Sequence, residues 1–323
     1  MRVFLTGGTG FIGAHLVNAL LAQGSQVTCL VRSPAKAAGL GARGVRLVRG
    51  DLEARTALRE GAAGADVVIH LAGLIAARTA RELIAANRDG TANVLEAAAA
   101  HPPGRFLFVS SIAAAGPTVP GQPLDESAPP HPVTPYGASK LEAETLVRSA
   151  TFPWTIVRPP VVYGERDRAT LGIFRLANRV LVPVLGDGSQ ELSAIHGADL
   201  AAALVTAASA PGAIDKVYFA AHREITTSRG LALAVGRALG KTPRVIPVPA
   251  PVARVVMSVA GMIARMAGRA SVLSPERADE FLAPAWTCRP DALRADTGWE
   301  ATIDLATGLA RTAAWYRQEG WLA

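Results

Sequence analysis

The chain has 323 residues, of which 50% are hydrophobic and 18% are charged, a balance typical of a soluble globular protein and unlike a disordered one. Its 33 basic residues outnumber the 26 acidic ones, but they are scattered along the chain, so we expect no nucleic-acid partner. The two cysteines exclude a disulfide framework and lack the spacing of metal ligands.

Apolar segments alternate with helical patterns through the first half of the chain. The predicted strands cover residues 3–5, 27–31, 45–48, 67–71, 106–109 and 155–157, and the predicted helices cover 15–22, 54–61, 81–100 and 136–149. Strands that alternate with helices indicate an α/β fold, a Rossmann-type, doubly wound parallel sheet. The apolar segment 3–5 is too short for a signal peptide, so we expect a cytoplasmic protein.

The second half of the chain is organised differently. Glycine and proline interrupt residues 181–188 and 244–251, which predicts irregular structure there. Helical patterns follow at 252–266 and 304–318, and residues 216–220 are predicted to return to the main sheet as a strand. We therefore expect a nucleotide-binding domain over residues 1–163, completed by about 195–225. Residues 164–194 and 226–323 would form a smaller, interwoven substrate-binding cap.

A glycine-rich turn joins the first strand to the first helix. Gly7, Gly10 and Gly13 stand at the spacing that lets a backbone approach a pyrophosphate at a helix N-terminus. The sequence therefore predicts a dinucleotide cofactor. The second strand ends in Arg32, with Lys36 four residues later and no acidic residue beside them. A guanidinium suits the 2′-phosphate of NADP, so we expect NADP to be preferred over NAD.

Three polar side chains are candidates for catalysis. Tyr136 and Lys140 stand four residues apart and share one face of a predicted helix. Ser111, or its neighbour Ser110, follows the strand at 106–109, at the sheet edge where ligands bind in parallel sheets. The choice between them follows from the family resemblance given below, in which the serine stands five residues before a glycine, as Ser111 does before Gly116.

These motifs resemble those of the extended short-chain dehydrogenase/reductase family, in its 3β-hydroxysteroid dehydrogenase and dihydroflavonol reductase branch. The resemblance runs from Met1 to about Leu200. It implies that Tyr136 is the general acid/base, that Ser111 binds the substrate oxygen, and that Lys140 holds the nicotinamide ribose. It implies further cofactor contacts from Phe11, Ile12, Asp51, Leu52, Leu71, Ala72, Gly73, Asn87, Pro159 and Val162, and a possible homodimer through residues 81–100 and 136–149.

Local departures from the family pattern bear on the substrate. Sugar-nucleotide dehydratases have an acidic pair where this chain has Ile112 and Ala113, and sugar-nucleotide binders often have Asn at the place of Val161 and Arg at that of Leu192. Together with Ile195, these residues predict an apolar pocket. Arg166, Arg168 and Arg175 are the alternatives that could bind a diphosphate.

Residues 251–269 carry apolar side chains at helical spacing, flanked by arginines. Two interpretations are open, a cap helix that packs its apolar face on the core and a helix that lies on a membrane surface.

The sequence thus predicts an oxidoreductase that interconverts a secondary alcohol and a ketone on a lipophilic small molecule, which would be sterol-, isoprenoid- or polyketide-like. A nucleotide-sugar epimerase with tightly bound NAD and a non-catalytic cofactor-sensing protein are the alternatives. His70, His101 and His196 lie in separate segments, and we expect no metal.

Overall fold

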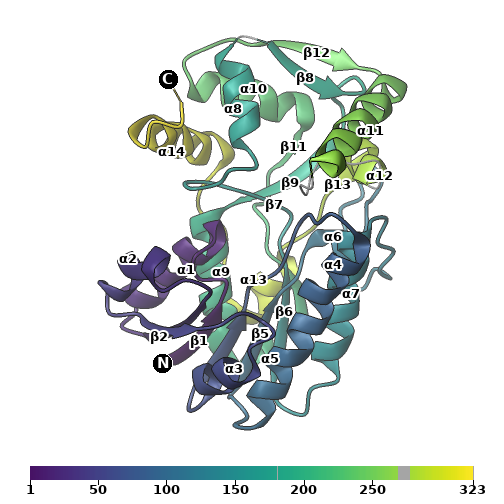
Figure 1. Cartoon of the computed structure of the whole chain (residues 1–323). Coiled ribbons are helices and arrows are strands. Elements are labelled where there is room, and N and C mark those ends of the chain that lie inside the picture. The colour runs from purple at the N-terminus through teal and green to yellow at the C-terminus, as the bar shows by residue number, and fades with distance from the viewer. Residues whose placement is uncertain (180, 268–276, 323) are drawn as a thin grey trace.

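A seven-stranded parallel sheet organises the chain, and the computed structural model describes it over residues 1–179, 181–267 and 277–322. The strand order is β10-β6-β5-β4-β1-β2-β3 (Figure 1). The strands are β1 (Arg2–Thr6), β2 (Gln26–Val31), β3 (Arg46–Arg49), β4 (Val67–His70), β5 (Arg105–Val109), β6 (Trp154–Arg158) and β10 (Lys216–Phe219). Successive strands extend the sheet to one side from β1 to β3 and to the other side from β4 onwards. Ligands bind in open α/β sheets at such a switch point, which here lies between β1 and β4. The predicted fold class is confirmed.

Helices cover both faces of this sheet. One core cluster joins the sheet to α1 (Phe11–Ala22) and α9 (Gly197–Ser209), and the other joins it to α3 (Arg55–Ala62), α5 (Gly90–Ala99) and α7 (Pro135–Arg148). Along β1 the side chains alternate, so Val3 and Leu5 face the first cluster and Phe4 faces the second. Burial on both faces explains why the strands read as continuous apolar runs.

The connections contain short helical elements. η1 (Ala35–Ala37) and α2 (Ala38–Gly41) follow β2, and α6 (Ile112–Ala115) follows β5. The predicted helix 81–100 is formed by three consecutive pieces, α4 (Ala80–Ile84), the π-helical turn η2 (Ala85–Asp89) and α5.

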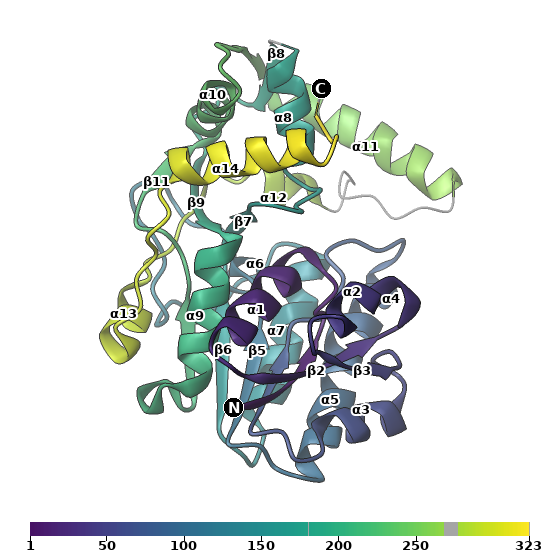
Figure 2. The same ribbon diagram turned by 90° about the vertical axis from the view of Figure 1, so that its left-hand side faces the viewer.

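A second lobe is built from segments after Pro160. Its sheet has the order β11-β9-β13, with β7 paired to β9, from β7 (Val161–Tyr163), β9 (Glu191–His196), β11 (Ile225–Thr227) and β13 (Ala285–Trp286). Around it lie α8 (Leu171–Asn178), α10 (Ser228–Ala238), α11 (Ala250–Met266), α12 (Ala278–Leu282) and α14 (Leu305–Gln318) (Figure 2). η3 (Pro211–Ala213) and α13 (Asp291–Thr297) instead lie by β10 and α9.

Every predicted strand is present within one residue at each end. The prediction of irregular structure at 181–188 and 244–251 is wrong, because β8 (Leu181–Leu185) and β12 (Arg244–Val248) pair as a parallel two-stranded sheet. In the described residues this sheet has only two strands, so each strand has an outer edge without a partner strand. Pro183 and Pro247 lack a backbone N–H, which is tolerated in such edge strands. The first helix begins at Phe11 rather than at residue 15, because the glycine turn itself ends at its N-cap, Gly10.

A buried carboxylate ties α7 to the sheet. Glu144 has no exposed surface and accepts hydrogen bonds from Ser110 Oγ at 2.6 Å and from Arg158 Nε and a terminal nitrogen at 2.8 and 2.6 Å. Arg148, one turn later on α7, donates to it at 2.9 Å. Ser110 follows β5 and Arg158 ends β6, so this one side chain fixes α7 against two strands.

Replacing Glu144 by Gln should lower the free energy of unfolding by about 3–5 kcal/mol, because the buried Arg158 guanidinium loses its counter-charge. Urea denaturation measures the change. The matched control is Glu142→Gln on the same helix, where the carboxylate is half exposed and its ion pair with Arg88 should contribute less than about 1 kcal/mol. Equal losses in the two variants would contradict this assignment.

Candidate active site

The glycine turn forms a cradle that side chains would obstruct. Gly7 has φ +81°, and a Cβ there would lie 2.8 Å from the Ala72 nitrogen on the loop after β4. A Cβ on Gly13 would overlap the Gly7 carbonyl oxygen. No side chain caps the N-terminus of α1, so the first N–H groups of the helix, near Phe11 and Ile12, remain available to a ligand. These features fit the pyrophosphate of a dinucleotide.

The carboxyl ends of β1 to β4 bring most of the predicted cofactor residues to one edge. Arg32 directly follows β2, and Lys36 lies in η1; both side chains are exposed at this edge. Asp51 follows β3, where its carboxylate accepts from the N–H groups of Glu53 and Ala54 at 3.0 and 3.1 Å. Leu52 is half-buried beside Gly90 of α5. Arg32 and Lys36 therefore place two exposed cations at this edge of the sheet.

The loop after β4 crosses the mouth of the cradle. The Leu71 and Ala72 N–H groups donate to Thr6 at the end of β1, at 3.3 and 3.2 Å. Gly73 lies where a Cβ would come within 2.8 Å of the Asn87 side-chain oxygen and 4.0 Å of Lys140 Nζ. The loop therefore brings the predicted phosphate-side and ribose-side residues together.

The Asn87 side chain is buried and joins two segments of the protein. Its side-chain oxygen accepts from the Leu74 N–H at 2.8 Å. Its side-chain nitrogen donates to the Leu74 carbonyl and to Ser139 Oγ, each at 2.9 Å. It thus joins the loop after β4 to α7, between Tyr136 and Lys140. Asn87 therefore holds the loop after β4 in place, and its predicted contact with the cofactor stays a prediction.

The predicted catalytic side chains meet at the ends of β5 and α7. Burial raises the pKa of Tyr136, and the Ser111 hydroxyl lowers it and so partly opposes that rise. Ser111 Oγ accepts from Ala113 N at 3.1 Å and caps the N-terminus of α6. Ser110, the competing candidate, is buried and donates to Glu144, so its hydroxyl belongs to the structural network.

Lys140 is buried beneath the tyrosine, one turn further along α7. Its Nζ donates to the Val109 carbonyl at 2.7 Å and lies 4.2 Å from the centre of the Phe108 ring. Burial lowers the pKa of Lys140 to about 7, against the attraction of Glu144, which raises it. The ammonium and its neutral form are therefore both accessible near neutral pH.

On the nicotinamide side, Pro159 and Val162 lie after β6. The Pro159 carbonyl accepts from Ile112 N at 2.9 Å, which holds this segment against α6, beside Ser111. Val162 sits in β7, paired with Ile195 of the second sheet. The segment that the resemblance assigns to the nicotinamide thus passes between the two lobes.

Two charged residues that the sequence did not reveal lie near enough to Tyr136 to influence its pKa. Arg277 and Glu280 form an ion pair at 2.6 Å with most of both side chains buried, and both influence the pKa of Tyr136, Arg277 lowering it and Glu280 raising it. Arg277 also donates to the Ile75 carbonyl at 3.5 Å, beyond the loop after β4. No motif marks this pair, because it is about 140 residues from the tyrosine and is placed only by the fold of the second lobe.

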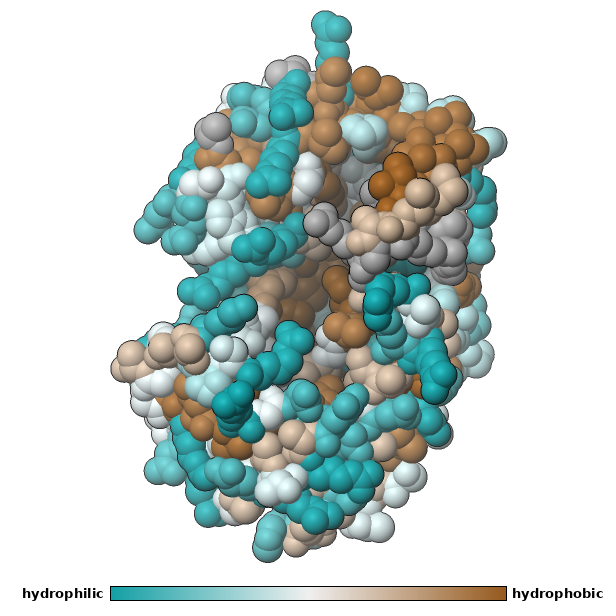
Figure 3. All heavy atoms as spheres, viewed as in Figure 1, coloured by the Kyte–Doolittle hydropathy of each residue, from teal (hydrophilic) through white to brown (hydrophobic). Residues whose placement is uncertain are grey.

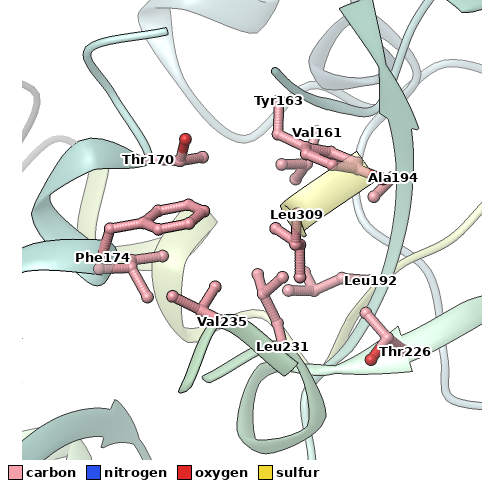
Figure 4. A pocket seen from close by; sticks show the side chains of 11 residues that line it. Val161, Tyr163, Thr170, Phe174, Leu192, Ala194, Thr226, Leu231, Val235 and Leu309 are labelled. Carbon is pink, nitrogen blue, oxygen red and sulfur yellow. The ribbon is translucent and has the colours of Figure 1, made fainter. Parts of the chain in front are cut away.

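An apolar crevice lies in the second lobe (Figure 4). Val161, Leu192 and Ala194 point into it from β7 and β9, and no charged residue is found among the side chains described as lining it. Its free space is about 10 Å³, roughly that of one water molecule, so a ligand would enter only if the lining moves apart. Figure 3 shows the surface hollowed between the lobes, with apolar residues inside.

The predicted apolar lining is corrected in part by the structure. Val161 and Leu192 line the crevice, as expected. Ile112 and Ala113 are instead buried in α6, and Ile195 packs into the core of the nucleotide-binding lobe. Their apolar character therefore serves packing.

The histidines make local hydrogen bonds. His70 is fully buried between Thr6 and Thr91, at 2.7 and 3.0 Å, and burial lowers its pKa to about 3, so the ring is neutral. His196 Nε2 lies 3.2 Å from Glu165, and His101 is exposed. Within the described ranges, no group of three His, Cys, Asp or Glu side chains is arranged to hold a metal ion.

Comparisons with known proteins show the family to which the chain belongs. The model of the NAD dependent epimerase/dehydratase family matches residues 3–220. A ceramide reductase from Caulobacter vibrioides is 35% identical over 323 residues, covering 99% of this chain and 96% of that protein. A 4-hydroxy-2-methyl-3-oxo-4-farnesyl-3,4-dihydroquinoline-1-oxide ketoreductase from Stigmatella aurantiaca is 39% identical over 227 residues, covering 68% of this chain and 67% of that protein.

A solved structure extends the likeness to the whole fold. The UDP-glucose 4-epimerase of Thermus thermophilus in complex with NAD superposes with a TM-score of 0.79 at 26% identity, covering 98% of this chain and 99% of that one.

Replacing Lys140 by Met should change the pH dependence of stability. Because burial lowers the lysine pKa from 10.5 to about 7, the unfolded chain holds an extra proton between these values. The charge therefore destabilises the folded wild type fully below about pH 7 and progressively less as the pH rises towards 10.5. The unfolding free energy of the variant relative to wild type should thus fall from pH 7 to pH 10. Urea titrations measure it, with the exposed Lys36→Met as control; a difference that stays constant with pH would contradict the buried ammonium.

Proposed function

Because the chain belongs to the NAD dependent epimerase/dehydratase family and is an NAD(P)-dependent oxidoreductase, we propose that it interconverts a secondary alcohol and a ketone on a lipophilic small molecule. The observation that carries the proposal is the placement of Ser111, Tyr136 and the buried Lys140 at the ends of β5 and α7, with Lys140 Nζ beside Gly73 of the loop that crosses the glycine cradle.

Each of the three residues has a chemical role in the proposed reaction. The nicotinamide, when bound, supplies or accepts the hydride at carbon. In the direction of reduction, the Tyr136 hydroxyl gives its proton to the substrate oxygen and becomes a phenolate. The positive charge of the Lys140 ammonium would favour that phenolate. The Ser111 hydroxyl also lowers the pKa of Tyr136, against the larger rise that burial causes. Ser111 also donates to the substrate oxygen.

Two observations support a lipophilic substrate. The crevice that contains Val161 and Leu192 has no charged lining to meet a diphosphate among the residues described there. Two relatives are named for lipophilic compounds, ceramide and a farnesyl dihydroquinoline oxide, and the ceramide reductase matches nearly the whole chain. A long-chain ketone related to ceramide is therefore the first substrate to test.

The likeness to the epimerase fold favours the nucleotide-sugar alternative. However, this chain has Leu192 where nucleotide-sugar binders often have the arginine that binds the diphosphate. Of the three arginines that could substitute, Arg168 lies 4.7 Å from the Trp321 ring, and all three lie outside the crevice lining. We infer that a diphosphate would lack its bidentate partner at this place.

Tyr136→Phe should lower kcat for reduction of a long-chain ketone by about 100-fold or more, because the proton donor is lost. Cofactor affinity should stay within about twofold, since the phenyl ring keeps its packing. NADPH oxidation and fluorescence titration of NADPH measure the two effects. Tyr218→Phe, whose hydroxyl bonds Asp296 at the far edge of the sheet, is the matched control. Full activity in Tyr136→Phe would overturn the mechanism.

We further propose that NADP is the preferred cofactor, through Arg32 with Lys36 beside it. Arg32→Ala should reduce the ratio of kcat/KM for NADP to that for NAD by about tenfold or more, because a charge-assisted hydrogen bond to a phosphate contributes about 1.5 kcal/mol or more. Arg46→Ala is the matched control, because Arg46 begins β3 at the end away from the cofactor edge and pairs with Glu60. It should leave the ratio of kcat/KM for NADP to that for NAD unchanged. A wild-type preference for NAD, or an unaltered ratio in Arg32→Ala, would contradict the proposal.

A further inference from the structure

Helix α11 exposes an apolar face that the fold does not use. Seven of the seventeen exposed large hydrophobic side chains in the described chain lie on this helix. The exposed fraction is 62% for Val255 and 83% for Met266. We call these seven side chains the α11 apolar face: Val252, Val255, Val256, Val259, Met262, Ile263 and Met266. Monomeric soluble proteins rarely expose a contiguous apolar patch of this kind without a partner.

The opposite side of α11 faces the protein through smaller contacts. Ala253, Met257 and Gly261 recur every four residues and are buried. The helix packs on α12, to which Arg254 is also joined by an ion pair with Asp279 at 2.8 Å. The interpretation in which the apolar face packs on the core does not hold for the seven exposed side chains; Arg269, in the same predicted segment, lies outside the described residues.

The patch continues beyond the helix. β12 leads directly into α11, and Ile246 on β12 and Leu181 on its partner β8 are each almost half exposed. Figure 2 shows α11 projecting from the side of the second lobe, and Figure 3 shows apolar residues gathered over the part of this lobe where β8, β12 and α11 lie.

The positive charge around this patch favours an anionic lipid surface over a second copy of the chain as its binding partner. Residues 225–275 include seven basic residues and no acidic one. Five of the basic side chains are described and exposed: Arg229, Arg237, Lys241, Arg244 and Arg254. A second copy of the chain would bring two such cationic segments together, whereas an anionic lipid surface attracts each Lys or Arg and also accepts apolar side chains.

We propose that the α11 apolar face docks the protein on the surface of an anionic lipid bilayer. The helix has 17 residues and is about 25 Å long, so it fits in the interface parallel to the membrane. No helix in the described ranges is long and apolar enough to cross a membrane. The packing of α11 on α12 places the docked face one helix away from Arg277 and Glu280, beside Tyr136.

The test is flotation of the purified protein with vesicles, and it uses no substrate, so its outcome is independent of the proposed reaction. Wild type should float with vesicles of phosphatidylcholine and phosphatidylglycerol, and less with phosphatidylcholine alone. Added salt should weaken binding to the anionic vesicles. Failure to float with anionic vesicles would overturn the proposal, and so would equal, salt-independent flotation with both.

The variant Val255→Asp/Met262→Asp removes two side chains from the apolar face. Partitioning should fall by about tenfold or more for each, the fold-change that corresponds to about 1.5 kcal/mol per buried side chain. Ile214→Asp, an exposed isoleucine on the other lobe, is the control and should float like wild type. Unchanged melting temperature and NADPH affinity verify folding, as expected for exposed positions.

Sedimentation without lipid distinguishes the other occupant. A wild-type dimer that the double variant abolishes would show that a second copy covers the face and would overturn the membrane proposal. If the double variant misfolds, Lys241→Ala/Arg244→Ala takes its place and should bind anionic vesicles more weakly than wild type; unchanged binding would count against the proposal.

Discussion

The site depends on the buried carboxylate of Glu144. It receives hydrogen bonds from Ser110, beside the predicted catalytic residue Ser111, and from Arg158, which precedes the segment that the resemblance assigns to the nicotinamide. On its own helix it lies four residues from Lys140, which in turn lies four residues from Tyr136. One desolvated ion pair thus sets the relative positions of three segments that are distant in sequence. Because a buried charge tolerates little misalignment, these segments are held with little freedom.

Much of this arrangement follows from the sequence, and the reason is local. Gly7 and Gly13 mark a turn whose geometry other residues would obstruct, and Tyr136 and Lys140 share a helix face by spacing alone. The strands of the main sheet are buried on both sides, so their apolar runs are unambiguous. The preference for Ser111 over Ser110 comes from its spacing to Gly116, whereas the bond from Ser110 to the buried Glu144 depends on the fold and appears only in the structure.

The second lobe was less predictable because its determinants are non-local. Pro183 and Pro247 look like strand breakers until the free edges of the β8–β12 pair are known. Arg277 and Glu280 reach Tyr136 only through tertiary folding. The periodicity of α11 identified a helix with an apolar face, but periodicity cannot say whether that face meets protein or solvent. Ile112 and Ile195 show the converse, apolar residues in motif positions that turn out to pack the core.

The π-helical turn η2 has a consequence for sequence variation. A π turn accommodates about one more residue than a turn of α-helix, so α4 and α5 face as they would in a regular helix one residue shorter. Deleting a single residue between Ala85 and Asp89 would therefore let a regular helix form while α5 kept its buried side. The part that would change is the π turn itself, which carries Asn87 and directs its amide to Leu74 and Ser139. The additional residue in this stretch therefore serves the placement of Asn87 rather than the packing of α5.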